Sequence, residues 1–214
     1  GELLFLARPR HEAVLEGSGA LRAEARRGKI KISGEGVLQA TDGMKRKAEA
    51  WACALRAEAE VSDRLTISAE HSAASGDPDP SDGLRRTFDP VLPFAHAYLG
   101  HSDLVGWKNI RSVMAGLSLK LREGLFAHAD GHSFRLMDVR DAWYSAAGVP
   151  LRADPSGKAS KALGGEVDLY VKGKVQKGLS VWAGYSRFQP GDFVKATGQA
   201  SPTDWAFLQT AVDF

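Results

Sequence analysis

Alternation of polar and apolar residues is the strongest pattern in this chain. Over residues 166–175 one set of alternate positions is Glu166, Asp168, Tyr170, Lys172 and Lys174, and the other is Val167, Leu169, Val171, Gly173 and Val175. Successive side chains of a strand point to opposite faces, so this segment predicts a strand with one charged and one apolar face. The same alternation recurs over residues 12–24, 29–40, 64–73, 111–121 and 178–187.

Short turns separate these segments, and two connections are long. The predicted turns lie at residues 25–28, 41–44, 62–63, 122–124 and 176–178. The connection 77–109 is rich in Pro and Asp, and the connection 141–165 is rich in Gly, Ser, Ala and Lys. Strands joined in this way describe an antiparallel up-and-down meander. We expect about eight to ten strands in one domain over residues 1–214, including weaker strands at 3–7 and 125–139.

Residues 47–61 fit two interpretations. The segment is rich in Ala and Glu, and Trp51, Leu55 and Ala59 have helical spacing. As a strand, it places Trp51 and Leu55 on one face and Arg56 and Glu58 on the other. Because the neighbouring segments are predicted strands, we predict a strand here.

Three observations favour a sheet with its apolar face toward lipid. The polar face carries charges of both signs, which a wet lumen solvates, and the apolar face holds few large aromatic residues for a packed core. The last segment, residues 205–214, alternates and closes on Phe214, which resembles the assembly signal of bacterial outer-membrane barrels. A soluble β-sandwich binding module is the alternative, and it requires the face of Val167, Leu169 and Val171 to be buried.

Composition narrows the possible functions. The chain has 214 residues with 28 Lys and Arg against 26 Asp and Glu, and this near balance argues against charge-driven binding of nucleic acid. No run approaches the ~20 apolar residues of a transmembrane helix. The single cysteine, Cys53, excludes an intrachain disulfide and a multi-cysteine zinc site. The 23 glycines suit strands, bends and turns.

The chain shows no catalytic constellation. It has no nucleophile elbow, phosphate-binding loop or paired-carboxylate motif, so we predict neither an enzyme nor a cofactor. His128, Asp130 and His132 share one strand face, but no further ligand has a fixed spacing, so we predict no metal site. The carboxylates of residues 77–82 are expected to belong to a solvated loop rather than to a calcium site.

Several separate segments resemble the alginate-export family of outer-membrane β-barrels, in the same order and with similar spacing. They are Phe88-Asp89-Pro90, Tyr98-Leu99-Gly100, residues 103–110, Asp141-Ala142-Trp143-Tyr144, residues 164–169 and residues 184–194. The resemblance covers about three-fifths of the chain and implies a monomeric outer-membrane barrel that passes an anionic polysaccharide or, in some members, another solute.

The length of the chain departs from that family. The resemblance implies wider barrels of about eighteen strands, so this chain resembles roughly their C-terminal half. A barrel of eight strands is filled by side chains and would not conduct a sugar chain. Three alternatives stay open: a fragment, a chain that other chains complete into a barrel, and a small relative with a different role.

We therefore expect an all-β, antiparallel transmembrane barrel, or a part of one, in the bacterial outer membrane. It would act as a passive porin or exporter for an anionic polysaccharide or small solute, in contact with outer-membrane lipid and the barrel-assembly machinery. Charged side chains would guide the solute, since carboxylates bind cations strongly. The candidates are Arg22, Lys29, Lys31, Lys120, Arg135, Glu166, Asp168, Lys172 and Lys174. A structural barrel subunit that anchors a larger envelope assembly is the alternative function.

Overall fold

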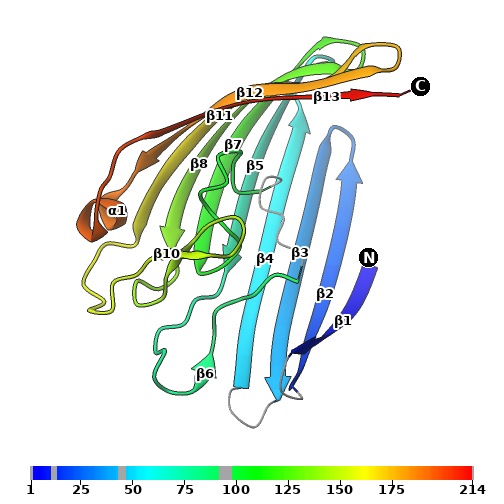
Figure 1. Cartoon of the computed structure of the whole chain (residues 1–214). Helices are drawn as coiled ribbons and strands as arrows, with labels where there is room; N and C mark the ends of the chain where they lie inside the picture. The colour runs from blue at the N-terminus through cyan, green and yellow to red at the C-terminus, as the bar shows by residue number, and fades with distance from the viewer. Residues whose placement is uncertain (1, 11–13, 43–46, 92–97, 214) are drawn as a thin grey trace.

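The computed structural model describes residues 2–10, 14–42, 47–91 and 98–213 of the chain. Long antiparallel strands follow one another in chain order through one sheet (Figure 1). They are β1 (Glu2–Arg10), β2 (Val14–Arg27), β3 (Ile30–Asp42), β4 (Lys47–Glu60), β5 (Leu65–Ala74), β7 (Ile110–Arg122), β8 (Leu125–Leu136), β11 (Ala162–Gln176), β12 (Leu179–Pro190) and β13 (Thr203–Val212). The predicted all-β, up-and-down arrangement is confirmed.

Sequence alternation located the long strands well. The ambiguous segment 47–61 forms β4, which pairs with β3 and β5 over most of its length. The pattern did not predict four short elements, of which the three strands lie in the long connections and the helix lies between β12 and β13. They are β6 (Leu84–Arg85), β9 (Trp143–Tyr144), β10 (Pro150–Arg152) and α1 (Asp192–Thr197). No helix in the described part of the chain is long and apolar enough to cross a membrane.

The sheet is curved, and the long connections lie across its concave side (Figure 1). One connection runs from the end of β5 to the start of β7 at Ile110, and the other from the end of β8 to the start of β11 at Ala162. These are the predicted long loops, shifted by a few residues. Short turns join the strands at the opposite end. We call these two ends of the sheet the loop end and the turn end.

The convex face of the sheet is apolar and exposed. Val167 and Leu169 of β11 are 53% and 52% exposed, and Leu208 of β13 is 74% exposed. The β-sandwich alternative required Val167 and Leu169 to be buried, and the structure shows the reverse. An apolar outer face with charged side chains on the inner face is the order that a sheet in lipid requires.

Apolar packing occurs on the concave side, at the loop end. There the first residues of β7 and the last residues of β8 meet side chains from the loops and α1. The buried cluster includes Phe88, Leu99, Val105, Ile110, Phe134, Leu136, Trp143, Leu163, Phe188 and Phe193. The loops thus act as a second layer, which buries hydrocarbon that the single sheet would leave exposed.

Candidate functional site

Charged side chains cover the concave face toward the turn end. The register places them in cross-strand rows: Arg22 opposite Glu35, Lys31 opposite Glu58, Arg56 opposite Glu70, and His128 opposite Tyr170. Arg22 and Arg56, for example, alternate with the exposed Leu21 and Leu55, as a strand requires. A polar hollow of about 400 Å³ lies among them, lined by residues that include Lys29, Lys31, Arg56, Glu58, His128 and Tyr170.

Ion pairs link several of these charges. The Arg56 guanidinium lies 3.1 Å from the Glu58 carboxylate and 3.4 Å from the nearly buried Glu70 carboxylate. Lys31 Nζ lies 3.2 Å from the Glu24 carboxylate. Arg22 and Lys29 have no ion-pair partner among the described residues. Some cations of this face are therefore engaged in ion pairs, whereas Arg22 and Lys29 are available to bind an anion.

Most of the predicted path residues lie on this face. Arg22, Lys31, Lys120, Lys172 and Lys174 all share the inner side of their strands, and Lys29 lines the polar hollow from the β2–β3 turn. Lys172 Nζ lies 4.2 Å from the centre of the Trp182 ring, in cation–π geometry.

Arg135 does not join them. Its neighbours on β8, Phe134 and Leu136, are buried on the concave side, so Arg135 lies on the opposite, outer face, where it pairs in register with Arg111. Sequence alternation in this segment is weak, which is why the face was misassigned. Phe214, the predicted assembly signal, lies outside the described residues.

Glu166 and Asp168 lie on the inner face but beneath the loop between β5 and β7. Glu166 accepts hydrogen bonds from both the backbone N–H and the hydroxyl of Ser102, the former at 2.9 Å. Asp168 Oδ2 lies 3.5 Å from His101 Nδ1 and 3.3 Å from His132 Nε2. These two carboxylates hold the loop against the wall rather than line an open path.

The loop tip depends on a glycine at one point. Gly100 has a φ of +85°, and a Cβ atom added there would overlap the Glu166 carboxylate. Only glycine combines this backbone conformation with so close an approach. The next residue, His101, stacks on Phe207 with ring centres 5.4 Å apart. The tip is therefore fixed to the wall by both polar and aromatic contacts.

Two polar residues join the long loops to each other. Buried Asn109 donates from Nδ2 to the carbonyls of Asp138 and Ala142, at 2.7 and 3.0 Å, and accepts from the Asp138 N–H at 2.8 Å. Asp141 accepts from the Thr87 hydroxyl at 2.6 Å and from the Tyr144 hydroxyl at 2.7 Å. Because Tyr144 is half-buried beside the Asp141 carboxylate, its pKa is raised well above the ordinary value.

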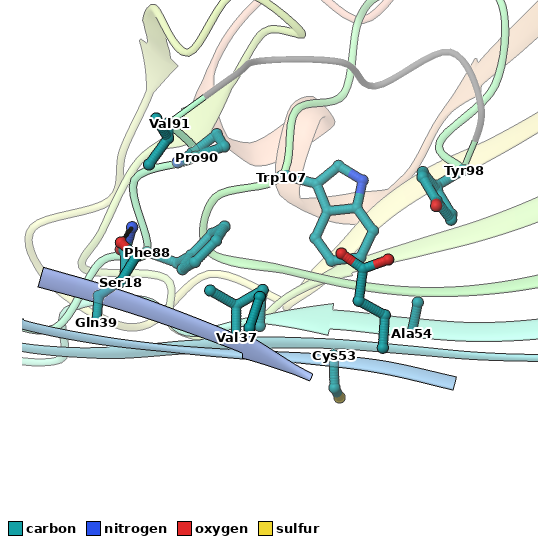
Figure 2. A pocket seen from close by; sticks show the side chains of 13 residues that line it. Ser18, Val37, Gln39, Cys53, Ala54, Phe88, Pro90, Val91, Tyr98 and Trp107 are labelled. Carbon is teal, nitrogen blue, oxygen red and sulfur yellow. Dashed lines mark hydrogen bonds between the residues drawn. The ribbon is translucent and has the colours of Figure 1, made fainter. Parts of the chain in front are cut away.

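A second, mainly apolar hollow lies between the same loop and strands β2–β4 (Figure 2). We call this cavity of about 250 Å³ the aromatic hollow, and its walls include Val37, Phe88, Pro90, Tyr98 and Trp107. The Tyr98 and Trp107 rings meet edge to face with centres 5.3 Å apart. Gln39 supports the loop above the strands: it donates to the Asp89 carbonyl at 2.7 Å and accepts from the Asp89 N–H at 2.9 Å.

A third cavity adjoins the aromatic hollow. This charged hollow of about 240 Å³ is lined by residues that include Arg22, Lys31, Glu35, Arg56 and Tyr98. Tyr98, Glu35 and Ala54 line both cavities, so the two adjoin each other. Partial burial raises the pKa of Tyr98, and the nearby Glu35 and Glu70 carboxylates raise it further. The Tyr98 hydroxyl is therefore a neutral hydrogen-bond donor at the junction.

The concave face brings no metal-binding constellation together within the described residues. Asp130 accepts a hydrogen bond from the Tyr170 hydroxyl at 3.1 Å, and His128 stacks on the same Tyr170 ring. His132 instead approaches Asp168. Two of the three candidate ligands of β8 thus contact Tyr170, and the third contacts Asp168.

The model of one protein family, described as alginate export, matches residues 20–207 of the chain. The chain belongs to the alginate export family. The resemblance of its motifs is thereby confirmed, and the match also includes part of β2 and strands β3–β5, which precede the first of those motifs. A search of curated proteins found no match.

The structure explains what the family-like segments do in this alginate export family member. Asn109, Asp141 and Trp143 belong to these segments, and all three tie the loops together; the Trp143 indole donates to the Leu104 carbonyl at 2.8 Å. Tyr98 and Trp107 belong to the same motifs, but the sequence pattern does not mark them as a site. Their partners on β2–β4 are distant in sequence, and no local signal could place them in one cavity.

Proposed function

We propose that this alginate export family member forms the wall, or part of the wall, of an outer-membrane β-barrel. An acidic polysaccharide would pass along its concave face by passive transport. The observation that carries the proposal is the reversed sheet: the apolar face is exposed on the convex side, and charged side chains line the concave side. Lipid would cover the convex face, and the barrel-assembly machinery would insert the strands. The family is one of export proteins rather than enzymes, which fits a path without catalysis.

The charges of the concave face suit weak, repeated binding. Lys29, Lys31 and Arg22 would attract the carboxylates of a polyuronate, whereas Glu58 and Glu35 would prevent tight retention. Conduction needs such a balance, because a solute that binds too strongly does not leave. A smaller anionic solute would use the same cations.

Planar-bilayer conductance tests this proposal directly. The protein is purified from outer membranes in its native assembly, so that any further chains that complete a barrel stay with it. We expect a conducting species that prefers anions and that polymannuronate blocks at lower concentration than a neutral mannan of equal length. A conducting species blocked equally by both polymers would contradict the acidic substrate.

A structural role is the second candidate, and the packed loop end favours it. Phe134, Trp143 and Phe188 occupy the concave side where a solute would have to pass in a narrow barrel. A native species with the mass of one chain and no conductance would support a sealing or anchoring subunit and would contradict transport.

A further inference from the structure

The aromatic hollow and the charged hollow together have the features of a binding site for one sugar unit. Both are smaller than the roughly 300–1,000 Å³ of ordinary small-molecule pockets. A mainly apolar cavity adjoins a charged one at this place on the concave face. A ligand that filled both would need one apolar face and one anionic group.

The walls of the aromatic hollow provide the apolar contact. Tyr98 and Trp107 line it from the loop, and Val37 and Ala54 line it from the strands (Figure 2). Aromatic rings offer a broad apolar surface with a polar edge, which suits a pyranose ring and its hydroxyls. The cysteine nearby contributes no chemistry, because Figure 2 shows the Cys53 side chain pointing away from the hollow.

A free hydrogen-bond donor lies at the same place. The Trp107 Nε1 atom is buried and has no hydrogen-bond partner among the described residues. Figure 2 shows it on the side of the indole that is nearer to Tyr98. A buried donor without a partner destabilises the protein, so a ligand oxygen that accepted a hydrogen bond from it would stabilise the complex.

The charged hollow provides the anionic contact. The Arg22 guanidinium lines it and is exposed, and it has no ion-pair partner among the residues described. Arg56 and Lys31 line the same cavity but are engaged with Glu58, Glu70 and Glu24. Arg22 is therefore the cation available for a carboxylate, in the planar two-donor geometry that arginine favours.

We infer that these two hollows form a subsite for one uronate unit of an acidic glycan. The pyranose ring packs against the exposed surface of the Tyr98 and Trp107 pair, its carboxylate binds Arg22, and the Glu35 carboxylate accepts a hydrogen bond from a ring hydroxyl. This inference rests on the proposed function, because it assigns one position on the same concave face to one unit of the transported chain.

Binding of short oligosaccharides tests the subsite separately from transport. Isothermal titration calorimetry on the detergent-purified native protein would compare a mannuronate trimer with neutral mannotriose. We expect the acidic trimer to bind at least about tenfold more tightly, since a charge-assisted hydrogen bond is lost with the neutral sugar. Equal affinities for the two trimers, or no binding of either, would overturn the inference.

Substitutions test the apolar half and the anionic half of the subsite separately. Tyr98→Ala should weaken both trimers about tenfold, whereas Arg22→Gln should weaken only the acidic trimer, to the level of the neutral one. Trp107→Phe keeps the ring and removes the free N–H, and should weaken both trimers severalfold. Trp205→Phe, at an exposed position on β13, is the matched control and should bind like the unaltered protein.

The same series of variants includes a check of folding and separates the subsite from the proposed transport. Near-ultraviolet circular dichroism identifies any variant that has lost its packed loops, and Tyr98→Phe then replaces Tyr98→Ala with a milder expected loss. The selective binding pattern without bilayer conductance would support the subsite and contradict transport. Conductance with acidic-polymer block, but with unchanged binding in Tyr98→Ala and Arg22→Gln, would overturn the subsite and leave the proposed function standing.

Discussion

The two ends of the concave face are built from the same strands but from different chemistry. On β8, Phe134 and Leu136 at the loop end are buried, whereas His128 and Asp130 toward the turn end line a polar hollow. The inward positions of one strand thus change from hydrocarbon to charge over a few residues. The change coincides with the edge of the region that the loops cover.

This difference shows how a single sheet can carry both a core and a wet surface. A sheet whose apolar face is exposed cannot bury that face against itself, so buried hydrocarbon on the other side needs a second layer. The loops provide that layer only at the loop end. Where they stop, the inner side chains must be satisfied by water and by each other, as in Arg56 with Glu58 and Glu70.

The largest expected effect comes from removing a ring at the packed end. Phe188 is 2% exposed and stacks on Phe134 and Trp143 with ring centres 6.4 and 6.2 Å apart. Phe188→Ala should lower the free energy of unfolding by about 3–5 kcal/mol, because it removes buried hydrocarbon and leaves a cavity. Urea unfolding in detergent measures this change.

The matched control for Phe188→Ala lies on the convex face. Leu208→Ala shortens a side chain that is 74% exposed and lies outside the buried cluster found in the described part of the chain. Its effect in detergent should stay within about 0.5 kcal/mol. If the two variants lowered the free energy of unfolding equally, the loop end would not be a separate packed layer, and the two ends of the concave face would not differ in packing.

The second prediction concerns the polar joint between the loops. Asn109→Ala removes three hydrogen bonds, leaves the Asp138 and Ala142 carbonyls without their donor, and places alanine at a φ of +51°. We expect a loss of about 2–3 kcal/mol, since buried groups lose partners and alanine tolerates positive φ poorly.

Limited proteolysis gives the local readout for Asn109→Ala. Cleavage within 75–109 and 137–161 should accelerate, while the turns at the other end stay resistant. Ser118→Ala, at the turn end, is the control and should change neither stability nor cleavage. Uniform cleavage along the chain would mean that Asn109 supports the whole sheet rather than the loops.

The strands were predictable from sequence because each one carries its own signal. Period-two alternation in 166–175 is local, and it assigned both the strand and its charged face correctly. The segment 47–61 needed its neighbours, since helical spacing of Trp51, Leu55 and Ala59 competed with alternation. Arg135 was misassigned because Phe134 and Leu136 are apolar on the inner face, so the usual rule of polar inside fails beneath the loops.

The cavities could not be predicted, for a different physical reason. Tyr98 and Arg22 line one hollow although they lie on separate elements, and their meeting depends on how the loop folds back over the sheet. Glu166 and Asp168 were expected to line a path, but the loop tip at His101 and Ser102 covers them. Alternation gives the direction of a side chain and does not show what covers it.

The third prediction concerns the open end, where charge should affect selectivity more than stability. Lys31 pairs with Glu24, but both side chains are partly exposed. Lys31→Gln should therefore change the free energy of unfolding by less than about 1 kcal/mol. It should also lower the anion preference of the conductance, measured as a shift of the reversal potential in a salt gradient.

Lys195→Gln is the charge-matched control for Lys31→Gln. Lys195 belongs to α1 at the loop end, and its exposed ammonium group lies 3.6 Å from Asp192 on the same helix. This variant should leave the reversal potential unchanged. Equal shifts in both variants would show that net charge, rather than the position of Lys31 on the concave face, sets the selectivity.

The smallest expected effect is a local pH dependence at the loop end. Hydrogen bonds from the Ser156 hydroxyl at 2.6 Å and the Ala159 N–H at 2.7 Å hold the pKa of Asp154 below its usual value. A carboxyl whose pKa is lowered by folding stabilises the folded loop above its unfolded pKa of about 3.9 and loses that effect as the pH falls through the lower, folded value. Hydrogen exchange of the Lys158 and Ala159 amides, corrected for intrinsic rates, should therefore show protection at pH 6 that declines below about pH 4.

Asp154→Asn should reduce the protection at pH 6 and remove its pH dependence, whereas Asp63→Asn in the β4–β5 turn should leave it as in the unaltered protein. Protection that stays constant from pH 6 to pH 3 in the unaltered protein would show that the loop is held by its packing, through contacts such as that of the Asp154 N–H with the Val139 carbonyl, and not by the ionised carboxylate.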